Sequence, residues 1–181
     1  VIGERLNRTG KRYLQEALSQ KDFSVLLQEA IKQKEAGADL LDVNVGLPEI
    51  DEAKTMAEVI KQLQGIIDLP LSIDSMNRDV LEAAVRVYNG KPLINSVNGK
   101  DDVMAELFPL VKKYGACAVC LTLDEKGIPP TAEKRLEIAK RIVNKAAQYG
   151  IDKEDLIMDC LVLTASTEQS QIPETLRAIS L

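Results

Sequence analysis

Short apolar runs alternate along this chain with longer segments of helical periodicity, and this alternation limits the possible folds more than any other feature. The apolar runs are rich in Leu, Ile and Val and are continuous, as is typical of strands buried on both faces. The segments between them bring an apolar residue round every three to four positions, which indicates amphipathic helices. Units of roughly 25 to 35 residues of this kind predict parallel strands joined by right-handed crossovers.

Six such strand–helix units follow one another. We expect strands in "VIGERLN", "ADLLDVNVG", "LSIDSM", "PLINSVNG", "ACAVCLTLD" and "DLIMDCLVL". Helices are expected over residues 22–37, about 51–66, about 78–88, about 101–114 and about 131–149, with a last one opening near Pro173.

Two architectures fit this order, an open doubly wound sheet and a TIM (β/α)₈ barrel. The first strand-to-helix turn has no glycine-rich dinucleotide fingerprint, which weakens the open-sheet alternative. Each predicted strand ends in polar residues, and in a barrel such ends converge on one mouth, so we predict the barrel. The strand-end residues are Glu4, Asn7, Asp42, Asn44, Asp74, Ser75, Asn95, Ser96, Thr122, Asp124 and Asp159.

Six units do not close an eight-stranded barrel. We therefore expect residues 1–181 to be one domain that is incomplete at its C-terminus, with strands seven and eight not present. The alternative is a complete, small open sheet.

Composition excludes several functions. The sequence has no histidine, which removes Ser-His and Cys-His pairs and histidine metal sites. A net charge of −5 without a basic run argues against nucleic acid. Three cysteines, an odd number, and no signal peptide favour the reducing cytoplasm, and no apolar run is long enough for a membrane span. Cys117 and Cys120 have CxxC spacing, but three residues apart on a strand they would face opposite ways, so we interpret them as free thiols.

Three strand-end residues are difficult to explain as core. Asp74, Asn95 and Asp159 each follow buried apolar runs, and an unpaired buried carboxylate costs several kcal/mol. Carboxylates and amides without histidine suit either a hard cation such as magnesium or a polar heterocycle with donors and acceptors. For Asp42 a loop-capping role, and for Asp124 a turn role, remain alternatives. Nearby cations could meet an anionic tail, although solvated surface charges are the commoner case: Arg5, Arg8, Lys11, Arg12 and Lys100.

The motifs "IGERLN", "LLDVNVG", "SIDSMNRDVLEAA", "PLINSVNG", "LTLDEKGIP" and "LIMDCLVL" resemble the pterin-binding domain of cobalamin-dependent methionine synthase. They resemble equally the methyltetrahydrofolate:corrinoid methyltransferases of the same superfamily. The resemblance runs through the whole chain, with one motif per strand, and implies a TIM barrel. Dihydropteroate synthase is the nearest alternative, but its sulfonamide-site loop resembling "ESTRPG" is replaced here by "NVGLPEIDEA".

The resemblance implies that Asp74, Asn95 and Asp159 bind the pterin ring of methyltetrahydrofolate, with Glu4 and Asn7 lining the same pocket. Asp42, Asn44, Ser75 and Ser96 would support it. The N5 methyl group would pass to the cobalt of a corrinoid (cobalamin) held by a partner domain or protein, without a metal bound to this domain. The asparagine that contacts N5 in the family is expected beyond residue 181, so these residues alone are expected to have weak or no activity.

Several alternatives stay open. A magnesium-dependent aldolase or lyase could use Asp42, Asp74 and Asp159, and a non-catalytic remnant could only bind. The final methyl acceptor, homocysteine or a corrinoid protein, is not specified by the sequence. A homodimer is also possible, because unclosed barrel edges promote association.

Overall fold

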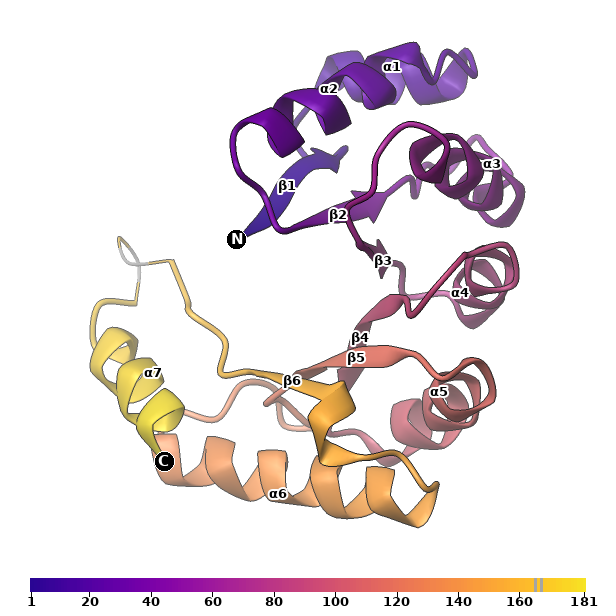
Figure 1. Cartoon of the computed structure of the whole chain (residues 1–181). Helices are drawn as coiled ribbons and strands as arrows, with labels where there is room; N and C mark the ends of the chain where they lie inside the picture. Colours follow the sequence, from indigo (N-terminus) through magenta and orange to yellow (C-terminus); the bar gives the residue numbers. More distant parts are fainter. Residues whose placement is uncertain (165, 167) are drawn as a thin grey trace. The chain divides into compact units, whose positions relative to one another are not determined.

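The computed structural model describes residues 1–164, 166 and 168–181, and in that part of the chain six strands alternate with helices (Figure 1). The strands are β1 (Ile2–Asn7), β2 (Leu40–Asn44), β3 (Leu71–Asp74), β4 (Leu93–Asn98), β5 (Cys117–Leu121) and β6 (Leu156–Asp159). The helices are α1 (Arg12–Ser19), α2 (Ser24–Glu35), α3 (Glu52–Gln64), α4 (Arg78–Val85), α5 (Asp101–Tyr114), α6 (Ala132–Gln148) and α7 (Gln171–Ser180), with a short 3₁₀ turn at Lys153–Asp155. The predicted α/β class and all six predicted strands are confirmed.

One helix, α1, was not predicted from the sequence. It has only eight residues, and Lys11 at its start provides no side-chain cap. Its apolar side is formed by Leu14, Ala17 and Leu18, which are buried. These three positions have the i, i+3, i+4 spacing of an amphipathic helix, but no capping side chain marks where the helix begins.

The chain divides within β4 into two compact units, residues 1–95 and residues 96–181. In the first unit β1, β2, β3 and the start of β4 are parallel neighbours in that order. Residues of β2 and β3 are buried up to the strand ends, where the sequence changes to Asn44 and Asp74. In Figure 1, α3 and α4 lie side by side on the same side of these strands.

Local capping fixes where the helices of the first unit begin. Asp51 accepts a hydrogen bond from Lys54 N at the start of α3, and Asn77 accepts one from Asp79 N at the start of α4. Such caps satisfy backbone donors that a helix leaves unpaired. Helix α4 therefore begins four positions after the end of β3, and α3 begins eight positions after the end of β2.

In the second unit β5 and β6 are parallel, with Cys120 opposite Met158. Helix α5 ends at Gly115, which has a left-handed φ of 61°. Phe108 of α5 packs against Tyr149 with ring centroids 5.8 Å apart. Helices α6 and α7 are in contact, so this unit has its own apolar interior.

Gly99, at the start of this unit, is a close-contact position. A Cβ there would lie 2.6 Å from Ile138 Cγ2 and 2.8 Å from the Leu123 carbonyl oxygen. The same carbonyl accepts a hydrogen bond from Gly99 N at 2.8 Å, so it has little freedom to move.

We expect Gly99→Ala to destabilise the protein by about 1–3 kcal/mol, the usual cost of overpacking. Gly65→Ala is the matched control, because its nearest neighbours would be the Gln62 and Lys61 carbonyl oxygens at 3.3 and 3.6 Å. Urea unfolding measures both. Equal midpoints for the two variants would contradict the crowding at Gly99.

Candidate functional site

The polar ends of β1, β2 and β3 are joined by hydrogen bonds centred on Asp74. Asp74 Oδ2 accepts from Asn44 Nδ2 at 2.9 Å and from Asn7 Nδ2 at 3.3 Å. Asn7 and Asn44 are register partners in neighbouring strands, which is why both amides reach the same carboxylate. Three residues predicted from separate strand ends therefore meet within the first unit.

A second carboxylate–amide pair lies beside this cluster. Asp42 is only 1% exposed, and its Oδ1 accepts from Asn95 Nδ2 at 3.0 Å. Asp42 precedes Asn44 by two positions on β2, so both side chains point to the same face of the sheet. Asp74 and Asn95 are register partners. We refer to Asn7, Asp42, Asn44, Asp74 and Asn95 together as the strand-end cluster.

Ser75 connects the strand-end cluster to the starts of α3 and α4. Its backbone N–H donates to the Asn95 carbonyl oxygen at 3.1 Å. Its hydroxyl donates to Glu52 Oε1 at 2.7 Å and accepts from Asn77 N at 3.1 Å. Both bonds of the Ser75 hydroxyl are therefore made within the protein.

Glu52 and Lys11 are contributors that sequence reasoning did not place in the site. Glu52 follows the cap residue of α3, where an acidic residue is usual for helix starts, so nothing in the local pattern indicates its bond to Ser75. Lys11 Nζ donates to the carbonyl oxygens of Glu4 and Asn7, both at 3.0 Å. It is therefore bonded to the end of β1 instead of being a fully solvated charge.

The surroundings raise the pKa of two carboxyl groups near the strand ends, Asp74 and Glu4. Burial raises the pKa of Asp74; the Asn44 hydrogen bond opposes this, and the charges of Asp42 and Glu52 add to it. Desolvation also raises the pKa of Glu4, with further increases from Asp42 and Asp74 and a decrease from Lys11. Glu4 is exposed along its side chain, so its shift reflects the surrounding acids as well as partial burial.

Ser96 and Asp159, two further predicted residues, belong to the second unit. Ser96 is partly buried on β4. Asp159 is exposed at the end of β6, where its Oδ1 accepts from Leu161 N at 2.7 Å. Its carbonyl oxygen accepts from both the N–H and the hydroxyl of Thr122, each at 3.1 Å.

Three further sequence interpretations concern a turn at Asp124, the cysteines and the basic residues near the strand ends. Asp124 forms a turn with Gly127, and its Oδ1 accepts from Lys126 N, as predicted. The cysteines are free thiols, and burial raises the pKa of Cys120 to about 12, which makes it a poor nucleophile. Arg5 pairs with Glu29 at 2.8 Å and Arg12 with Glu16 at 3.1 Å.

Two features are absent from the described residues. Among them, no group of three or more His, Cys, Asp or Glu side chains is arranged to hold a metal ion. No helix in the same part of the chain combines the length and apolar character that a membrane crossing needs.

The sequence profile of the pterin-binding enzymes matches residues 3–180, and the chain belongs to this family. The methionine synthase of Mycobacterium leprae (strain TN) is 34% identical over 177 residues, and the match covers 94% of this chain and 15% of that protein. A methylcorrinoid:tetrahydrofolate methyltransferase from Eubacterium limosum is 33% identical over 171 residues, covering 93% of this chain and 62% of that protein. The chain thus spans less than two thirds of the length of these curated relatives.

The similar solved structures establish the fold. Dihydropteroate synthase from Xanthomonas albilineans, in complex with 7,8-dihydropteroate, matches with a TM-score of 0.71 at 20% identity, over 99% of this chain and 68% of that one. The Yersinia pestis enzyme with a pterine–sulfa conjugate matches with a TM-score of 0.69 at 19% identity, over 95% and 62%. These are TIM-barrel proteins, so the predicted barrel type, represented here by six strand–helix units, is confirmed at the level of fold.

The raised pKa of Asp74 leads to a prediction about stability and pH. A carboxyl group whose pKa is higher in the folded than in the unfolded state costs stability once it ionises. Stability is therefore lost as pH rises from the ordinary carboxyl range, about 4, through the raised pKa. Asp74→Asn removes this loss, and its amide oxygen can still accept from Asn44 and Asn7.

We expect the thermal midpoint of Asp74→Asn, relative to the parent protein, to increase between about pH 4 and pH 7. Glu4 contributes to this difference in the same direction, because the Asp74 charge is one cause of its raised pKa and is removed in the variant. Glu35→Gln, at an exposed position of α2, is the control and should follow the parent protein. A constant difference between Asp74→Asn and the parent across the series would contradict the burial of a destabilising charge.

Proposed function

We propose that this chain binds methyltetrahydrofolate at the polar strand ends and takes part in transferring its N5 methyl group to the cobalt of a corrinoid on a partner domain or protein. The single observation that carries the proposal is the strand-end cluster, in which two acids are each held by amides inside a member of the pterin-binding family. The names of the relatives supply the reaction class, because they include methionine synthases and a methyltransferase named for a methylcorrinoid and tetrahydrofolate.

Asp74 has the free bonding capacity that a pterin contact requires. Its two amide donors both use Oδ2, and within the described residues Oδ1 receives no hydrogen bond. A carboxylate oxygen is acceptor-only, so Oδ1 suits a ring N–H or an exocyclic amino group. The amides fix the carboxylate in one orientation before a ligand arrives, which lowers the cost of ordering it on binding.

Asn95 is the second proposed contact. One N–H of its amide is directed to Asp42, and this bond assigns the orientation of the amide group. Its Oδ1 has no partner within the described part of the chain and is available to a donor on the heterocycle. Asp42, almost fully buried, is then a positioning residue for Asn95 and not itself a ligand.

The remaining proposed residues fall into two groups. Asp159 is proposed as a third contact to the pterin ring, and Glu4 and Asn7 as residues lining the pocket. Asn44, Ser75 and Ser96 are proposed as supports. Methyltetrahydrofolate is the substrate, and a bound corrinoid would supply the cobalt atom that accepts the methyl group.

Release of the methyl group sets a chemical requirement. Tetrahydrofolate is a poor leaving group, so N5 has to gain a proton or a hydrogen bond as the methyl group departs. The proposed contacts of Asp74 and Asn95 hold the ring in place while this happens, and orientation of this kind lowers the barrier to transfer.

We also propose that residues 1–181 act as one pterin-binding domain, with a corrinoid-binding domain or protein as its partner and a possible second copy of the chain. The match to the family over residues 3–180 supports the single domain. Three free thiols fit a reducing compartment such as the cytoplasm.

Similarity to dihydropteroate synthase does not favour that activity as an alternative, because 19–20% identity indicates fold alone. A magnesium-dependent aldolase or lyase would need carboxylate oxygens free to gather round a cation. In the strand-end cluster asparagine amides occupy Asp42 Oδ1 and Asp74 Oδ2, whereas Asp74 Oδ1 would be open to either a pterin donor or a cation. Chelation distinguishes the two chemistries directly.

We expect the full-length protein to bind methyltetrahydrofolate with the same dissociation constant in the presence and absence of EDTA. Asp74→Ala should weaken binding about tenfold or more, because losing a hydrogen bond to a charged group costs roughly 1.5–3 kcal/mol. Asp74→Asn should also bind weakly while retaining its fold, and Glu35→Gln should bind as the parent does.

Isothermal titration measures these constants, with circular dichroism to check folding. Absence of methyltetrahydrofolate binding, or binding that disappears with EDTA, would rule out the proposed function. Equal affinity of the parent and both Asp74 variants would remove Asp74 from the site.

A further inference from the structure

Arg135 of α6 is completely buried, at 0% exposure, and lies outside the strand-end cluster. All of its guanidinium nitrogens donate hydrogen bonds. Nε donates to the Pro129 carbonyl oxygen at 3.0 Å, and Nη2 donates to Gln171 Oε1 at 2.9 Å. Nη1 lies 2.8 Å from the Cys160 carbonyl oxygen, 3.1 Å from the Leu161 carbonyl oxygen and 2.7 Å from Thr175 Oγ1.

The acceptors of Arg135 are carbonyl, amide and hydroxyl oxygens. Burying a cation costs several kcal/mol unless its donors are satisfied, and a planar fork of five N–H groups suits several fixed acceptors at once. Lysine, with a single ammonium, could not reach the same set. The residue type is therefore matched to a particular arrangement of backbone oxygens.

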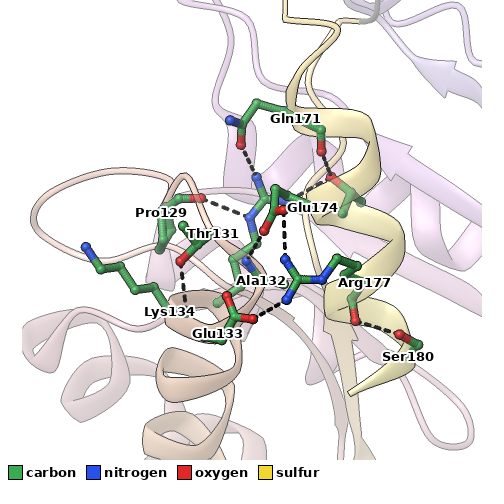
Figure 2. A network of polar contacts seen from close by, with 11 residues as sticks. Pro129, Thr131, Ala132, Glu133, Lys134, Gln171, Glu174, Arg177 and Ser180 are labelled. Carbon is green, nitrogen blue, oxygen red and sulfur yellow. Dashed lines mark hydrogen bonds and ion pairs between the residues drawn. The ribbon is translucent and has the colours of Figure 1, made fainter.

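Figure 2 shows the surroundings of these bonds, between the start of α6 and α7. Glu174 of α7 accepts from Ala132 N at 2.8 Å, and Arg177 of α7 pairs with Glu133 of α6. These contacts already connect the two helices. Holding α6 to α7 therefore does not by itself require a buried arginine.

Hydrogen bonds to the main chain of Cys160 and Leu161 connect Arg135 to Asp159. The Cys160 carbonyl and the Leu161 N–H belong to the same peptide group. Arg135 binds the oxygen end of this group, and the N–H end donates to Asp159 Oδ1 at 2.7 Å. One peptide thus links a buried cation to the carboxylate at the end of β6, and hydrogen bonds in such a chain strengthen one another.

This peptide lies in a turn whose backbone conformation has to be stabilised by contacts from other parts of the chain. Leu161 has a φ of 58°, in the left-handed region, which is unfavourable for an L-residue with a bulky side chain. Burial raises the pKa of the Cys160 thiol, Asp159 adds to the rise and Arg135 opposes it, as expected if both charges are close to this turn. Thr122 holds the Asp159 carbonyl from the side of β5.

We propose that Arg135 is a positioning residue for Asp159, acting through the peptide group between Cys160 and Leu161. By donating to the Cys160 carbonyl oxygen, Arg135 fixes the turn. The Leu161 N–H then holds the Asp159 carboxylate in one orientation for a donor on the pterin ring. The pterin contact of Asp159 rests on the proposed function, whereas the link from Arg135 to Asp159 does not.

The experiment compares the full-length parent protein with Arg135→Lys, Gln171→Leu, Asp159→Ala and the double variant of Arg135→Lys with Asp159→Ala. Gln171→Leu is the matched control, because it removes one acceptor of the same guanidinium on α7 and leaves the bonds to the turn. Three quantities are measured: the thermal midpoint, hydrogen exchange at the Leu161 amide, and the dissociation constant for methyltetrahydrofolate.

We expect the Leu161 amide to be protected in the parent and in Gln171→Leu, and to exchange at least about tenfold faster in Arg135→Lys and in Asp159→Ala. Arg135→Lys should weaken methyltetrahydrofolate binding about tenfold, roughly the effect of losing one good hydrogen bond. On the Asp159→Ala background the same change should have less than about a twofold effect, because residues acting as one unit are not additive. Gln171→Leu should lower the thermal midpoint without weakening binding.

Equal weakening by Arg135→Lys with and without Asp159 would overturn the proposal, as would unchanged exchange at Leu161 in Arg135→Lys. Weakened binding in Gln171→Leu to the same degree would show a general structural role instead. If Arg135→Lys does not fold, hydrogen exchange in the parent and in Asp159→Ala still tests the proposal. An unprotected Leu161 amide in the parent would contradict the link between Arg135 and Asp159. If exchange behaves as expected but Asp159→Ala binds normally, only the proposed pterin contact fails.

Discussion

Pairing of buried carboxylates with asparagine amides is the interaction on which the first unit of this protein depends. Asp42 is 1% exposed, and an isolated carboxylate there would cost several kcal/mol. The bond from Asn95 offsets that cost and at the same time connects β2 to β4 across β3. Asp74, held by Asn44 and Asn7, connects β3 to both strands on its other side. The same bonds thus stabilise the sheet and orient its polar end.

The two acids differ in the hydrogen-bonding capacity that remains after they pair with asparagine amides. Asp42 is enclosed and directs its bonding capacity inward, whereas Asp74 is partly exposed and keeps one oxygen without a partner in the described residues. Asp42 thus forms the buried part of the strand-end cluster, and Asp74 forms its accessible part.

The strands and most helices could be predicted because their signals are local. Continuous apolar runs with polar ends mark β2 and β3, and Gly and Asx residues mark many of the helix limits. Asp74 and Asn95 were recognisable as polar ends of buried runs. Asp159 was wrongly expected to follow a buried run, because the residues of β6 are partly or fully exposed. Helix α1 was missed although α4 has the same length, and α1 lacks the capping side chain that Asn77 provides for α4. The roles of Lys11, Glu52 and Arg135 could not be predicted, because each depends on partners that only the folded chain brings near, such as the carbonyl oxygens of Glu4 and Cys160.

The turn after β6 has one consequence for how this protein would respond to mutational surveys. Between Arg135 and Asp159, every atom that transmits the contact is a main-chain atom of residues 160 and 161. Replacing Cys160 or Leu161 by alanine leaves the carbonyl and the N–H in place. An alanine scan would therefore record these two positions as silent, while the residues at either end of the connection respond together.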